Sequence, residues 1–175
     1  MTVRAQIDQF NLSGTLEHIR GETLVHFRLA KLKAKDFLRV WIEHLARNLS
    51  EQKSAALYGK EKEEVAGYEF PPITNAKEVL ADLLALYWRG LCRPLPLFPR
   101  TSWTLVERIA AGKTEENARY AAGQIWKGNE RDGRGEREDP YIRLALRSAT
   151  DPLDQEWEKI SRRVFAPIFS QRKRR

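Results

Sequence analysis

Glu17, His26 and Arg28 are the residues whose types and spacing come nearest to a catalytic site. Positions 26 and 28 lie two apart in a stretch of alternating residues, so their side chains share one face of a predicted strand. A carboxylate on one strand, followed on the next by a carboxylate and a lysine two residues apart, can hold a divalent cation. That cation activates water for phosphodiester cleavage. The spacing therefore calls for a comparison with metal-dependent nuclease chemistry.

The comparison finds an incomplete set of groups. Glu17 can bind a metal, but His26 stands where a second carboxylate is needed, and imidazole is a poor ligand for magnesium. Arg28 stands where the lysine is needed, and its guanidinium cannot be deprotonated. We therefore predict a degenerate site with no catalytic residue and no bound metal. His18 and His26 facing one another across a hairpin, with Glu17 as third ligand, would be a metal site; a polar sheet face is the commoner use of such histidines.

A basic patch lies beside this site in the sequence. It is the densest cluster of cations outside the C-terminal tail and consists of Arg28, Lys31, Lys33, Lys35 and Arg39. Its functional interpretation is contact with DNA phosphates. The alternative is a solvated rim where a helix begins.

The elements that must position these groups follow from hydrophobic periodicity. Residues 2–30 alternate with a period of two around a turn at Gly21, which predicts a three-strand antiparallel meander. Residues 32–49 change to helical spacing around Trp41, and this helix should pack one face on the sheet. Residues 54–70 predict a hairpin whose turn is charged and whose second strand ends at Pro71.

The second half of the chain is predicted to be helical. A helix should start at Asn75 and stop at Gly90, followed by an extended linker over the three prolines of residues 93–99. Further helices are expected over 103–111 and 114–127, then a glycine-rich loop over 129–139. Asp139 and Asp151 each precede a proline and should cap the last two helices.

The order of strand meander, helix and strand is that of the PD-(D/E)xK nucleases. We therefore predict an α/β (α+β) chain with a restriction-endonuclease-like fold, catalytically degenerate, and a helical C-terminal half. Residues 1–175 are expected to form a single domain. It would be strand-rich over 1–70, helical over 74–170 and basic in the tail, 171–175.

The composition favours a globular protein with an anionic partner. The 175 residues are 42% hydrophobic and carry a net charge of +7. Four of those charges come from residues 172–175, which we expect to be a solvated end. Cys92 is the single cysteine, which excludes a disulfide and suits the reducing cytosol. Without a signal peptide or a long apolar run, the expected location is cytoplasmic with no membrane contact.

Several sequence strings carry a family resemblance. In chain order they are WIEHL (41–45), FPPI (70–73), YWRGL (87–91), PLPLFP (94–99), GEREDPY (135–141) and VFAPIF (164–169). Each string alone is weak, but their order over nearly the whole chain resembles the C-terminal region of the RecC family, the gamma chain of exodeoxyribonuclease V. The resemblance implies partners: the beta and alpha chains (RecB and RecD), and DNA. It also implies a nuclease-like fold, without cofactor, that has lost its catalytic residues and helps manage DNA strands during unwinding for double-strand break repair by homologous recombination.

Two other functions compete with this interpretation. An active metal-dependent DNA nuclease of the same fold should show an acid and a lysine where His26 and Arg28 stand. A stand-alone nucleic-acid-binding module should bind DNA by itself with a steep dependence on salt.

Overall fold

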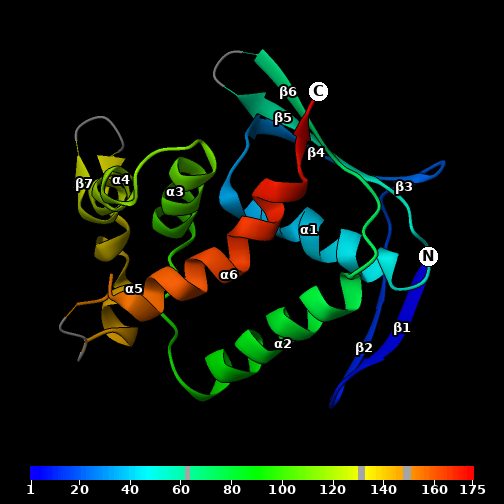
Figure 1. Cartoon of the computed structure of the whole chain (residues 1–175), viewed down its shortest axis with the longest axis horizontal. Helices are drawn as coiled ribbons and strands as arrows, with labels where there is room; N and C mark the ends of the chain where they lie inside the picture. The colour runs from blue at the N-terminus through cyan, green and yellow to red at the C-terminus, as the bar shows by residue number, and fades with distance from the viewer. Residues whose placement is uncertain (62–63, 130–132, 148–150) are drawn as a thin grey trace. The chain divides into compact units, whose positions relative to one another are not determined.

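The computed structural model describes residues 1–61, 64–129, 133–147 and 151–175 (Figure 1). The chain divides into two compact units. The first comprises residues 1–88 with 171–175, and the second comprises residues 89–170. Helix α2, Ala76–Cys92, belongs in part to each unit, and helix α6, Gln155–Gln171, lies almost wholly in the second.

A mixed sheet with the strand order β3-β4-β5-β6-β9 forms the centre of the first unit. The strands are Ile19–Arg20 (β3), Thr23–Lys31 (β4), Ala55–Glu61 (β5), Glu64–Phe70 (β6) and Lys173–Arg174 (β9). Strands β4 and β5 are parallel, and the other neighbouring pairs are antiparallel. A parallel pair needs a crossover, which helix α1 provides. The mixed α/β class and the β5–β6 hairpin are as the sequence predicts.

The first thirty residues form strands, but not one meander. Strands β1, Thr2–Ile7, and β2, Phe10–Thr15, pair with each other in a separate two-stranded sheet. The ladder ends after β2 because Leu16 turns into a small core with Val3 and Ala46. Met1 and Leu16 exchange backbone hydrogen bonds of 2.8 and 2.9 Å that close the open end of the hairpin. The predicted three-strand connection is therefore wrong, whereas the turn at Gly21, with φ of 56°, is confirmed.

Helix α1, Ala34–Asn48, covers one face of the mixed sheet. Phe37, Trp41 and Leu45 recur every four residues and are all buried. The ring of Phe37 lies 5.0 Å from that of Tyr68, and the ring of Trp41 lies 5.9 Å from that of Phe70, both on β6. These contacts confirm the predicted helix and show which face of the sheet it covers.

The second unit is helical, as predicted. It contains α3, Pro99–Ala110, α4, Glu115–Lys127, α5, Pro140–Ala145, and α6. Two short strands, Gly128–Asn129 (β7) and Gly133–Arg134 (β8), pair in the glycine-rich segment, and a 3-10 turn follows at Glu136–Glu138. The part of the predicted loop over residues 130–132 lies outside the described residues. None of the described helices is both long and apolar enough to cross a membrane.

Ser102 fastens α3 to α6 inside the second unit. Its buried Oγ accepts hydrogen bonds from the Phe98 backbone N–H at 3.2 Å and from Trp157 Nε1–H at 3.0 Å. The Ser161 hydroxyl lies 2.8 Å from the same oxygen. Phe98 and Trp157 also belong to the apolar core of this unit, so the polar contacts lie within the hydrophobic packing.

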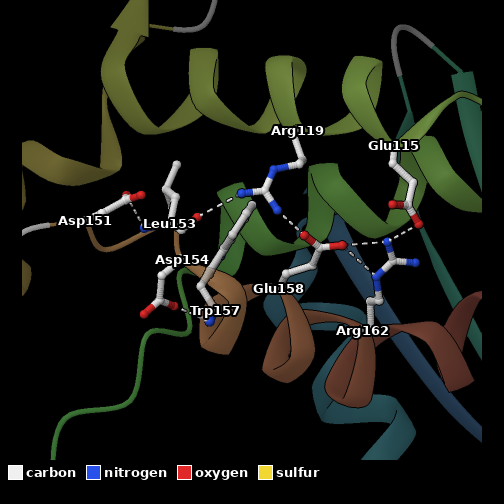
Figure 2. Close-up of polar contacts among 8 residues, drawn as sticks. All are labelled: Glu115, Arg119, Asp151, Leu153, Asp154, Trp157, Glu158 and Arg162. Atoms are coloured by element: carbon white, nitrogen blue, oxygen red, sulfur yellow. Dashed lines mark hydrogen bonds and ion pairs between the residues drawn. The ribbon is translucent and has the colours of Figure 1, made fainter.

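A network of ion pairs joins α4 to α6 on the outside of this core (Figure 2). The carboxylate of Glu158 accepts from Arg119 on one side and from Arg162 at 2.6 Å on the other. Arg162 also donates to Glu115 at 2.8 Å. Figure 2 shows Glu158 lying between the two guanidinium groups, which makes it the shared acceptor of the network.

Three predicted helix boundaries are corrected by the structure. Gly90 does not end α2, which continues to Cys92 and stops before Pro94, a residue that cannot extend a helix. Helix α3 begins at Pro99 because proline suits the first helical position. The N-terminus of α6 is bonded by Asp154, which accepts from Trp157 N–H at 2.9 Å, rather than by Asp151. The predicted cap at Asp139 is confirmed, because its side chain accepts hydrogen bonds from the backbone N–H groups of Tyr141 and Ile142.

The basic C-terminal segment is held on the sheet instead of forming a free end. Strand β9 pairs with β6 through Tyr68 and Glu69. Arg174 forms an ion pair with Glu61 and Arg175 with Glu69, each at 2.9 Å. These acids lie about a hundred residues earlier in the sequence, so the tail's charges alone did not reveal the pairing.

Candidate functional site

Strand β4 places two polar side chains, His26 and Arg28, on the face that α1 covers, beside the apolar Leu24, and exposes the apolar Phe27 and Leu29 on the other face. His26 is only 9% exposed and Arg28 is half-buried, whereas Phe27 is 71% and Leu29 97% exposed. The alternation predicted the two sets on opposite faces, and the structure agrees. Polar residues are buried here while apolar ones are exposed, because α1 supplies acidic partners for His26 and Arg28.

His26 is bound by a carboxylate from the helix. Its Nε2 lies 2.8 Å from Oε2 of Glu43, and its ring meets the ring of His18 edge to face at a centroid distance of 4.8 Å. The other oxygen of Glu43 accepts from Arg39 Nε at 3.1 Å. Glu43 thus has both oxygens engaged, by one imidazole and one guanidinium.

Arg28 is also bound by a carboxylate of α1, that of Asp36, which lies two turns before Glu43. Its Nη1 donates to Oδ1 of Asp36 at 3.2 Å, and Oδ2 of Asp36 accepts from the backbone N–H of Lys33 at 2.8 Å. Asp36 therefore neutralises Arg28 of the strand and also accepts a hydrogen bond from a free backbone N–H at the start of the helix. Within the described part of the chain, Arg28 Nε is buried without a hydrogen-bond partner.

Glu17 is exposed in the segment between β2 and β3. Within the described residues, its carboxylate forms no hydrogen bond or ion pair with His26 or Arg28. Nor do those residues contain a group of three or more His, Cys, Asp or Glu side chains able to hold a metal ion. The two histidines do meet, as the sequence allowed, but the carboxylate that binds His26 is Glu43 rather than Glu17.

Asp36 and Glu43 are the two site residues that the sequence reasoning missed. They are seven apart, which places them on the same side of a helix two turns apart. That spacing was available in the sequence. What the sequence did not give was the face of β4 that the helix would cover.

The basic patch divides into paired and unpaired cations. Arg28 and Arg39 form ion pairs with Asp36 and Glu43. Lys31, Lys33 and Lys35 are exposed, and none of them forms an ion pair within the described residues. Lys33 and Lys35 flank the first residue of α1, where the helix dipole is positive, and Asp36, the acidic residue of this turn, is already bonded to Arg28 and to the backbone N–H of Lys33. The arrangement therefore concentrates uncompensated positive charge at one end of α1, suited to binding an anion.

The comparisons with known proteins agree with the sequence strings described above. The sequence profile of the RecC C-terminal domain matches residues 1–110. The RecBCD enzyme subunit RecC of Buchnera aphidicola subsp. Schizaphis graminum (strain Sg) is 26% identical over 184 residues, covering 97% of this chain. The chain spans 16% of the length of that relative. Because the family profile covers well over half of its residues, the chain belongs to the RecC C-terminal domain family.

Proposed function

We propose that the chain is a non-catalytic, nuclease-like domain of an exodeoxyribonuclease V (RecBCD) complex in the cytoplasm. It would handle DNA strands and contact the beta and alpha chains during double-strand break repair. Residues 1–175 would act as one domain of a longer gamma subunit. The proposal rests on family membership, on the chemistry of the β4–α1 cluster and on two surfaces of the first unit.

The observation that carries the proposal is the closure of α1 over the degenerate site. The two groups that stand where a nuclease needs a carboxylate and a lysine, His26 and Arg28, are each occupied by a helix carboxylate. An in-line attack on a phosphodiester needs a metal to lower the pKa of water and to shield the phosphate charge. Both oxygens of Glu43 and both oxygens of Asp36 already accept hydrogen bonds, so neither carboxylate offers a free pair of oxygens to a metal.

A nuclease-like ancestry is supported by the order of the elements. The β4–α1–β5 unit is a parallel crossover, with antiparallel strands on both sides. This crossover supports the helix and strand part of the PD-(D/E)xK order, whereas the three-strand meander expected before it is not formed. In that comparison His26 and Arg28 occupy the strand that would carry the catalytic pair.

The nuclease assay tests the catalytic part of the proposal. Linear duplex and single-stranded DNA are incubated with the chain and magnesium, beside a Glu17→Ala variant prepared identically. We expect no cleavage by either protein. Cleavage by the wild-type chain that Glu17→Ala abolishes would identify an active nuclease, the alternative function, and would reject the inactive scaffold.

DNA contact is assigned to the lysines at the N-terminal end of α1. Each phosphate contact made by a lysine releases counterions, so the affinity must fall as salt rises. A Lys31→Ala/Lys33→Ala/Lys35→Ala variant should bind single-stranded DNA more weakly than the wild type and with a shallower salt dependence. Lys77→Ala, an exposed lysine on α2, is the matched control and should leave both quantities unchanged.

Partner contact is assigned to the face of the sheet opposite α1. Phe27, Leu29 and Val65 project from this face and are 71%, 97% and 84% exposed. Burying one such side chain fully stabilises a complex by about 1.5–3 kcal/mol. A pull-down with the purified beta and alpha chains should recover the wild-type chain and lose a Phe27→Ser/Leu29→Ser variant. Tyr141→Ser, at an equally exposed position of the second unit, is the control. Equal recovery of all three proteins would reject this face as the contact.

A further inference from the structure

A basic pocket opens in the second unit beside the first turns of α6. Its volume is about 460 Å³. It is lined by Arg89, Gln155, Glu156, Lys159, Ile160 and Arg163. Ile160 is buried and forms an apolar floor, while Lys159 and Arg163, on the same side of the helix, are exposed. The lining therefore combines three cations with a single carboxylate.

The carboxylate is already neutralised by two arginines. Oε1 of Glu156 accepts from Nη2 of Arg89 at 2.6 Å and from Nη2 of Arg93 at 2.5 Å. Arg89 and Arg93 are one helical turn apart, and a backbone bond of 3.0 Å between them extends the last turn of α2. One carboxylate thus fixes two guanidinium groups side by side, and each keeps further N–H donors.

The balance of charge around the pocket is positive. Among the described residues that line it, Arg89, Lys159 and Arg163 are cationic and Glu156, which also binds Arg93, is anionic. Lys159 forms no ion pair within the described part of the chain. Guanidinium and ammonium groups that converge on one pocket suit an anion with several acceptor oxygens, since each donor can reach a different oxygen. A phosphate, with its several acceptor oxygens, fits this chemistry.

We propose that this pocket binds a phosphodiester group of a DNA strand. It is a second DNA contact, independent of the lysines at the N-terminal end of α1. The attraction comes from Lys159 and Arg163 together with the arginine pair that Glu156 holds in place. A polyanion is the favoured ligand because the chain as a whole carries a net charge of +7.

The test measures binding of a fluorescein-labelled oligothymidylate to the whole chain by anisotropy at several salt concentrations. Lys159→Ala removes one phosphate contact from an exposed position, so the fold is kept. We expect about fivefold weaker binding and a salt slope shallower by about 0.7. Lys159→Glu should weaken binding further. Lys113→Ala, an exposed lysine of the same unit outside the pocket, is the matched control and should bind as the wild type does.

Two competitors distinguish the source of the anion. Unlabelled oligothymidylate should displace the probe, while inorganic phosphate should do so only at far higher concentration. Displacement by a hexaglutamate peptide as effective as by DNA would mean that the pocket takes an acidic protein segment, and would overturn the proposal. So would an unchanged affinity and salt slope for Lys159→Ala.

The α1 lysine variant separates this inference from the proposed function. Loss of binding in the Lys31→Ala/Lys33→Ala/Lys35→Ala variant with no effect of Lys159→Ala rejects the pocket and keeps the α1 contact. The opposite pattern keeps the pocket and rejects the α1 contact. Circular dichroism of each variant verifies that the fold is intact.

Discussion

His44 Nε2 lies 3.0 Å from the carbonyl oxygen of Pro71, the residue that follows β6. A carbonyl oxygen only accepts, so Nε2 must carry the proton. Nδ1 is then the acceptor for the side-chain amide of Asn48 at 3.2 Å. His44 is fully buried and uses both ring nitrogens in its neutral form, which fastens α1 to the end of the hairpin.

Acid should destabilise the first unit through this histidine. The pKa of His44 is lowered from 6.5 to about 4, chiefly by burial and to a smaller extent by the nearby charge of Arg47, against the opposing hydrogen bond to Pro71. Because the pKa is depressed in the folded state, the unfolded chain takes up the proton first as the pH falls. The contribution of His44 to the free energy of unfolding should therefore be fully present above pH 6.5. Between pH 6.5 and pH 4 the free energy of unfolding should fall by about 3 kcal/mol because of this residue. Urea denaturation across this range measures the decline.

The His44→Gln variant is the control for that decline. Glutamine cannot titrate, so its free energy of unfolding should be lower at pH 7 but should fall less between pH 6.5 and 4. The carboxylates of the chain contribute equally to both proteins. Parallel pH profiles for the wild type and the variant would contradict the assignment.

Asn48 is predicted to be intolerant of substitution. Its amide nitrogen donates to the carbonyl oxygens of His44 at 2.8 Å and Lys53 at 2.9 Å, and its amide oxygen accepts from Ile73 N–H at 3.1 Å. Asn48→Ala leaves these buried groups without partners, which should lower the free energy of unfolding by about 2–4 kcal/mol. Asn48→Asp should cost at least as much, because a carboxylate would face two carbonyl oxygens. Chemical denaturation measures both, and Asn117→Ala, at an exposed position, should change little.

The Glu158 network should also make the second unit sensitive to acid (Figure 2). Burial alone would raise the pKa of Glu158, but the hydrogen bonds and charges of Arg162 and Arg119 outweigh it and hold the pKa below 4.5. This contribution is present above pH 4.5 and is lost as the pH falls through the depressed pKa. Glu158→Gln should cost about 1–2 kcal/mol at pH 7, and this cost should shrink as the pH falls below 4.5. Glu116→Gln, exposed on α4, is the control; a cost for Glu158→Gln that does not change with pH would show that shape rather than charge matters.

The elements with strong local signals could be predicted from the sequence, and the burial of β4 could not. Period two around His26 identifies a strand, and helical spacing around Trp41 identifies the helix. Hydrophobicity alone would bury Phe27 and Leu29, yet the structure exposes both. The opposite face is buried because Asp36 and Glu43 neutralise it, and a pairing between elements is not encoded in the pattern of either one.

Long-range pairing also escaped the sequence reasoning at the C-terminus. Residues 172–175 have the composition of a solvated tail, and nothing local predicts a strand there. The segment is ordered by its pairing with β6, where Glu61 and Glu69 neutralise Arg174 and Arg175. Gly90 shows the converse error: a residue that often ends helices is tolerated inside α2, at a cost of about 1 kcal/mol relative to alanine.

The two contacts of Glu43 should differ in strength, and the difference tests what the β4–α1 cluster is for. The side chain of His26 is 10% exposed and that of Arg39 66%. A double-mutant cycle of His26→Ala and Glu43→Ala should give a coupling of about 1–2 kcal/mol, because a partly buried bond to a charged group is poorly replaced by water. The Arg39→Ala and Glu43→Ala cycle should give less than about 0.5 kcal/mol, as exposed pairs one helical turn apart do. Both cycles are measured by chemical denaturation at pH 7.

A cluster kept for catalysis would be expected to hold groups that work against stability. Strong coupling at His26 is therefore the result expected of a site that has become structural, and negligible coupling in both cycles would contradict that interpretation.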